Sequence, residues 1–230
     1  MPAPKGNIGL AAKTLAVWRK DVRCEFRTRY AVNAIILFGI TTLTVVSFAV
    51  GQMSLAPAAH ASLLWIIIFF SGMSGLAQAF IREEEAKTSM ALRLVADPTA
   101  VYLGKLLFNL ALLFLLLVVI APLFAVLTDV IVYHIGLLIL LLLLGGIGLA
   151  AATTLVGAII SKSGVKGALF AVLSFPILLP LLIGAIEGTK VAFTPGGGMA
   201  EASVQIQLLV GYTVVMVTAS LMLFGFVWEE

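Results

Sequence analysis

The sequence has few charged residues for its length. Only 11% of its 230 residues are charged, compared with about 25% in soluble domains, and 62% are hydrophobic. The mean hydropathy is +1.17. A soluble protein could not cover that much apolar surface, so the composition predicts an integral membrane protein. No run of Lys and Arg exceeds two residues, which argues against a nucleic-acid partner.

Residues that carry covalent or metal chemistry are also scarce. The single cysteine, Cys24, excludes an intrachain disulfide. The two histidines, His60 and His134, fall at the predicted outer edges of the membrane segments. They are weak candidates for haem iron ligation, because isolated edge histidines are more typical of plain interface residues. With no nucleophile–base pair either, the sequence predicts no catalytic residue, no metal site and no cofactor held by this chain.

A phosphate-binding loop of the G-x-x-x-x-G-K-[ST] type is missing as well. Gly104-Lys105 is followed by leucine, and the glycines at 196–198 are not followed by lysine. The chain is therefore not expected to be an enzyme that binds ATP. If ATP drives its function, another subunit must hydrolyse it.

Long apolar runs are what the sequence has in abundance. Six of them reach the length that a membrane-spanning helix needs. We place the spans at about 31–51, 61–81, 104–127, 135–160, 168–186 and 208–228. Pro122 should kink the third span, and Pro176 and Pro180 suggest a bent or broken fifth span.

The positions of the basic residues predict the orientation. With the N-terminus inside, the inner segments hold 13 of the 14 Lys and Arg residues, and the outer segments hold only Lys190. This asymmetry predicts six spans with both termini in the cytoplasm.

Residues 1–30 resemble an amphipathic helix that lies in the headgroup layer. Apolar residues recur at three- and four-residue steps from Ile8 to Phe26, and Lys13, Lys20, Arg23 and Arg27 fall on another face. The same pattern is also compatible with an ordinary basic flank of the first span.

A charged island, residues 80–109, separates the second and third spans. Three adjacent glutamates at about 100° per residue cover more than half of a helix circumference, so they cannot share one sheltered face. A charge at the bilayer centre costs about 3 kcal/mol or more. The segment 82–103 should therefore leave the membrane and form a short cytoplasmic helix over 86–96, ended by Asp97-Pro98. Asp97 or Thr99 is the candidate cap of the next helix.

Such a helix, held below the membrane, is suited to contact with a partner ATPase, although a plain solvated loop is the alternative. The candidate ATPase-coupling residues are Arg82, Glu83, Glu84, Glu85, Leu94, Asp97 and Pro98. The predicted fold is all-α and integral to the membrane, with the interfacial helix (1–30), a six-helix permease domain (31–228) and the coupling segment (82–103).

Several motifs in this arrangement resemble the haem exporter protein B (CcmB) family, which belongs to the ABC-2-like exporter permeases. The resemblance rests on G-M-S-G at 72–75, F-I-R-E-E-E at 80–85, A-L-R-L at 91–94, D-P at 97–98, A-V-Y-L-G-K-L-L-F-N at 100–109 and F-P-I-L-L-P at 175–180. Lys87 departs from the pattern, because a small residue, often glycine, is expected after the acidic run.

The resemblance implies a permease subunit for cytochrome c-type biogenesis in the prokaryotic inner membrane. Its implied partners are a cytoplasmic ATPase, a haem-handling membrane subunit, a haem chaperone and a second copy of this chain. The complex would either deliver haem or release a haem-loaded chaperone, and the lack of an ionisable lining favours release. The alternatives are an export permease for a lipid, glycan or drug, and a membrane scaffold without a transport cycle.

Overall fold

The computed structural model describes residues 9–51, 55–76, 78–85, 87, 92, 96–161 and 167–229. All regular structure in these residues is α-helical. The helices are α1 (Leu10–Thr28), α2 (Tyr30–Val50), α3 (Pro57–Gly75), α4 (Gln78–Glu85), α6 (Pro98–Leu127), α7 (Ile135–Ser161), α8 (Gly167–Ala192) and α9 (Ser203–Glu229).

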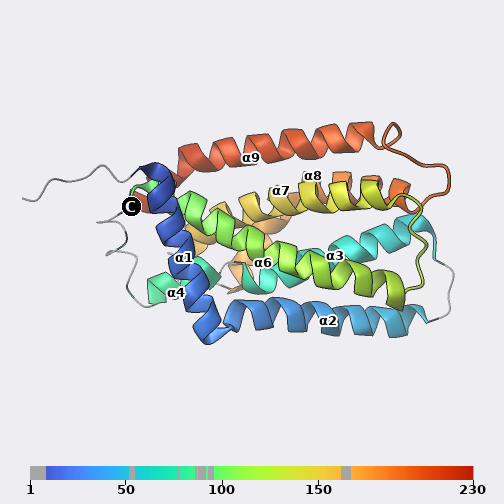
Figure 1. Ribbon diagram of the computed structural model, residues 1–230, viewed down its shortest axis with the longest axis horizontal. Coiled ribbons are helices and arrows are strands. Elements are labelled where there is room, and N and C mark those ends of the chain that lie inside the picture. The colour runs from blue at the N-terminus through green and yellow to red at the C-terminus, as the bar shows by residue number, and fades with distance from the viewer. Residues whose placement is uncertain are drawn as a thin grey trace, which may run out of the picture.

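Six helical stretches are long and apolar enough to cross a membrane, as the hydropathy pattern predicted. The second of them combines α3 and α4 and runs from Pro57 to Glu84. Figure 1 shows the long helices lying side by side along the longest axis of the molecule. The N-terminal helix α1 crosses one end of this bundle, where α4 and the C-terminus also lie.

The turn between α1 and α2 sets the crossing direction of α1. Arg29 adopts a left-handed conformation (φ 52°), and its N–H donates to the carbonyl oxygen of Glu25 at 2.6 Å. This single residue ends α1 and begins α2 without a longer loop. The chain thus changes direction abruptly at the predicted membrane surface.

Glycines allow the helices of the bundle to pack closely. A Cβ added to Gly145 of α7 would overlap the Trp65 ring of α3. The indole of Trp65 is fully buried and donates to the Thr189 hydroxyl of α8 at 2.9 Å. This contact joins three spans through one side chain, as expected for helices that associate by close packing in lipid.

Several predicted boundaries change in the structure. The third span begins six residues earlier, at Pro98, because α6 continues unbroken from the predicted cytoplasmic segment into the bundle. The fifth helix continues through Pro176 and Pro180 to Ala192, so it is not broken. The Tyr212 hydroxyl donates to the Ile177 carbonyl at 3.0 Å, beside these prolines. The predicted helix over 86–96 lies almost wholly outside the described residues.

Candidate functional site

The helix α1 turns an unexpected face toward the bundle. Its buried residues are Thr14, Val17, Asp21 and Glu25, spaced by three and four positions. This face packs against α6, where a Cβ added to Gly104 would lie 2.7 Å from the Val17 side chain. Two buried carboxylates need partners, since an unpaired buried charge is strongly unfavourable.

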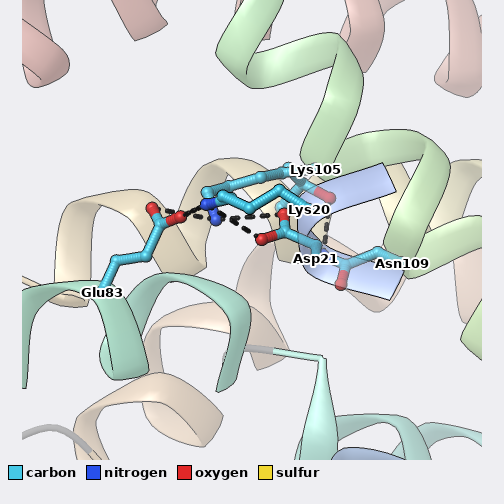
Figure 2. A network of polar contacts seen from close by, with 6 residues as sticks. Lys20, Asp21, Glu83, Lys105 and Asn109 are labelled. Atoms are coloured by element: carbon cyan, nitrogen blue, oxygen red, sulfur yellow. Dashed lines mark hydrogen bonds and ion pairs between the residues drawn. The ribbon is translucent and has the colours of Figure 1, made fainter. Parts of the chain in front are cut away.

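The partners of Asp21 come from α1 and α6, and both of them also pair with Glu83 of α4. The Lys105 side chain is fully buried and places its Nζ 3.3 Å from Asp21 and 3.0 Å from Glu83. Lys20 pairs with both carboxylates as well, at 3.1 Å from Asp21 and in direct contact with Glu83. Figure 2 shows these four side chains converging. We call Lys20, Asp21, Glu83 and Lys105 the charge cluster; its formal charges sum to zero.

A second ion pair lies close to the charge cluster along α1 and α4. Arg82 donates to the Glu25 carboxylate at 3.3 Å. The other oxygen of Glu25 accepts a hydrogen bond from the Val32 N–H of α2 at 2.9 Å. The charge cluster and this pair together connect α1 to α2, α4 and α6.

One side of the charge cluster is lined by aromatic rings. The Lys105 ammonium lies 4.7 Å from the centroid of the Phe80 ring, within cation–π range. The Phe224 ring of α9 lies 6.0 Å from Phe80 and 5.4 Å from Tyr102, and it stacks on Trp228 at 5.5 Å. The C-terminal helix therefore packs against the same group of residues.

The electrostatics of Lys20 favour its charged form. Burial lowers the pKa of Lys20, but the negative charges and hydrogen bonds of Asp21 and Glu83 outweigh this effect, so the net shift is upward from 10.5. Lys20 therefore stays protonated at physiological pH. Because the cluster holds two cations and two carboxylates, substitution of one member leaves a buried charge without its counterpart.

The structure brings together only part of the predicted coupling set. Arg82 and Glu83 lie on α4 and pair with the N-terminal helix. Glu84 is partly exposed on α4, and the side chain of Glu85 and all of Leu94 lie outside the described residues. Asp97 precedes α6 but makes no side-chain cap; its carboxylate instead pairs with Lys13 of α1 at 2.7 Å. Pro98 is the first residue of α6.

The turn after α4 gives a physical reason why a small residue is expected at position 87, where this chain has lysine. Lys87 has φ 53°, a conformation that favours glycine, and its N–H donates to the Glu84 carbonyl at 3.1 Å. A lysine thus occupies a left-handed position that glycine, which has no Cβ, would adopt with less strain.

The two histidines lie at the opposite end of the bundle. His60 is buried near the start of α3, and its ring meets Phe124 edge-on at 6.3 Å. His134 immediately precedes α7, and its backbone N–H donates to the Ala192 carbonyl. Among the described residues, no three His, Cys, Asp or Glu side chains gather as a metal-binding group.

Sequence reasoning missed four members of these ion pairs: Lys20 as a bridge, Asp21, Glu25 and Lys105. Asp21 and Glu25 are the only acids in the basic N-terminal segment, and they lie one helical turn apart. The available signal was the position of these two acids on one face of an otherwise basic helix, which suggests that this face packs against the membrane bundle. Their partners, 57 to 84 residues away, could not be read from this pattern.

The fold and this site define a multi-span α-helical membrane protein whose buried ion pairs join an N-terminal helix to the spans at one end. The sequence profile described as "CcmB protein" matches residues 12–227. The chain therefore belongs to the CcmB family, the haem exporter protein B family. Its members are transmembrane permease subunits of an ABC transporter for cytochrome c maturation and are not themselves enzymes. A comparison with curated proteins found no match.

Proposed function

We propose that this chain converts ATP hydrolysis by a cytoplasmic partner into movement of its membrane helices, and that the charge cluster carries this movement. The observation that supports the proposal is the fully buried Lys105, held by one carboxylate of α1 and one of α4. A push on α4 reaches the long span α6 through Glu83 and Lys105. The same push reaches α1 through Lys20 and Arg82.

Buried ion pairs suit this role because they resist separation. Removing one partner of a buried pair costs about 3–5 kcal/mol, whereas an exposed pair contributes about 0–1 kcal/mol. The elements joined by the cluster should therefore move as one body. The exposed Lys13–Asp97 pair adds a weaker link between α1 and the start of α6.

The movement serves haem delivery in cytochrome c maturation, and we favour release of a haem-loaded chaperone over conduction of haem through this chain. Lys105 is a buried cation within the third span, but its charge is matched by Asp21 and Glu83 rather than left for a haem propionate. The Asn109 amide within the same span donates to the Thr154 hydroxyl of α7 at 2.9 Å. These polar groups serve helix contacts. Bound haem between two copies of the chain would contradict this part of the proposal.

The proposed assembly contains two copies of this chain, a cytoplasmic ATPase and a haem-handling membrane subunit in the prokaryotic inner membrane.

To test the proposal, the chain is expressed with its genomic neighbours and the complex is isolated in mild detergent. Glu83→Lys should reduce ATPase stimulation and cytochrome c maturation at least tenfold, because it places a third cation beside Lys20 and Lys105. The double variant Glu83→Lys/Lys20→Glu restores the charge balance and should recover part of both activities.

A matched control is Glu187→Gln, which alters an exposed pair with Lys190 on α8, at the other end of the molecule. It should leave both activities within twofold of the wild type. Full coupling in the Glu83→Lys complex would refute the role of the cluster. Recovery of an ATPase without a haem-handling subunit would instead favour a general export permease, and recovery of no ATPase would favour a scaffold.

A further inference from the structure

The helix α1 has three distinct faces: one is buried against the bundle, a second is partly covered at Trp18 and Val22, and the third is exposed. At about 100° per residue, the buried face (Thr14, Val17, Asp21, Glu25) is followed around the helix by an apolar face and then by a basic face. The apolar face comprises Leu15, Trp18, Val22 and Phe26, and the basic face comprises Arg19, Lys20, Arg23 and Arg27. The three faces are separated by roughly a third of a turn each.

The basic face forms a shallow groove. It is lined by Ala16, Arg19, Lys20, Arg23, Cys24 and Arg27, all of which are exposed. Four of these six residues are basic and none is acidic. Lys20 is engaged by Asp21 and Glu83, whereas Arg19, Arg23 and Arg27 form no ion pair with the residues that the structure describes. The groove therefore holds three arginines whose positive charge is not neutralised by the residues that the structure describes.

The neighbouring apolar face indicates which anion the groove takes. Phe26 is 76% exposed and Leu15 is 40% exposed, and Arg19 lies at the border between these residues and the groove. Figure 1 shows α1 crossing the end of the bundle rather than running along the spans. A helix in this orientation can bury Phe26 among acyl chains while its arginines meet lipid phosphates. A protein bound only to the bases would leave the apolar face in water.

We propose that the groove of α1 binds the headgroup of an anionic phospholipid. Arginines suit this ligand, because the guanidinium presents paired donors to phosphate oxygens. Lys20 belongs both to the groove and to the charge cluster, so a headgroup bound here lies next to the ion pairs that join α1 to α4 and α6. The proposal does not depend on coupling to an ATPase.

Titration of the purified full-length chain tests the proposal. Phosphatidylglycerol or phosphatidylcholine is added in detergent, and native mass spectrometry counts the bound lipids. Phosphatidylglycerol should bind more tightly than phosphatidylcholine. Arg23→Gln should weaken its binding about fivefold, which is the contribution of one basic residue to affinity for an anionic membrane surface. Lys190→Gln, which removes one base at the other end of the molecule, should not change it, and Arg23→Lys should retain most of it.

Cys24 supplies a second measurement without any substitution, because it is the only cysteine and lies exposed in the groove. Phosphatidylglycerol should slow its reaction with a water-soluble maleimide, and phosphatidylcholine should not.

Equal binding of the two lipids, or an unchanged affinity in Arg23→Gln, would refute the proposal. Displacement by an equal concentration of inorganic phosphate would assign the groove to free anions. Protection of Cys24 by the partner ATPase without anionic lipid would assign it to protein docking.

Discussion

At the scale of single residues, Lys105 has the largest predicted effect. Lys105→Met leaves Asp21 and Glu83 buried with one cation instead of two, so we expect a loss of about 3 kcal/mol or more in the free energy of unfolding. Lys190→Met removes one partner of an exposed pair on α8 and should change it by less than about 1 kcal/mol. Thermal unfolding in detergent measures both. Equal effects of the two substitutions would show that the burial of Lys105 has no energetic consequence.

The pH dependence of stability reports on Lys20. Its pKa is raised above 10.5 in the folded protein, so its contribution to stability is fully present below 10.5 and is lost as the pH rises through the folded-state value. The difference in melting temperature between the wild type and Lys20→Gln should be constant from about pH 7 to 9 and should shrink above pH 10.5. A difference that already shrinks between pH 7 and 9 would contradict the upward shift.

Lys87 tests the turn that follows α4. Its left-handed conformation costs a residue with a Cβ about 1 kcal/mol relative to glycine. Lys87→Gly should therefore be at least as stable as the wild type, whereas the β-branched Lys87→Val should lose about 1–2 kcal/mol. Chemical unfolding curves compare the three proteins. A valine variant as stable as the wild type would argue against this backbone conformation.

At the scale of elements, Gly104 controls the contact between α1 and α6. A methyl group there would lie 2.7 Å from the Val17 side chain and 3.0 Å from the Thr14 carbonyl oxygen, so Gly104→Ala must push the helices apart. We expect a cost of about 1–3 kcal/mol, together with weaker coupling. Gly211→Ala in α9 is the control, because its Cβ would meet nothing within 4 Å. It should be neutral or stabilise the helix by up to about 1 kcal/mol.

The elements also show which local signals were sufficient. Hydropathy located all six spans, because the length of an apolar run is a local property that the bilayer thickness sets. The helix start near Asp97 was predicted correctly, but the span was placed only from residue 104, because charged Lys105 was interpreted as lying near the membrane edge. Its ion pairs with Asp21 and Glu83 allow the helix to bury this lysine. The local sequence around Lys105 does not predict these pairs, because both partners lie on other helices.

At the scale of the whole molecule, the charge asymmetry predicts that α1 and the C-terminus face the cytoplasm. Cys24 allows a direct test, since it is exposed on α1 and has no competing thiol. A membrane-impermeant maleimide should label it in inverted vesicles, slowly where anionic lipid covers the groove, and should not label it at all in intact cells. Cysteine placed at exposed Met199 in a Cys24→Ser background should show the opposite pattern. Labelling of Cys24 from outside would reverse the predicted topology.

The sequence by itself determined the membrane class, the number of spans and the family. These follow from composition, run lengths and short motifs, which do not depend on how distant parts of the chain meet. It also singled out Arg82 and Glu83, because charges beside a span stand out against an apolar background.

Only the tertiary structure decided what these charges contact. Asp21 and Lys105 are 84 residues apart and Lys20 and Glu83 are 63 apart, so their pairing depends on the packing of α1 against α6 and α4. That packing turned the acids of a basic helix inward and left its arginines on the surface. A buried charge is stable only beside its counterpart, and the position of that counterpart is a property of the fold.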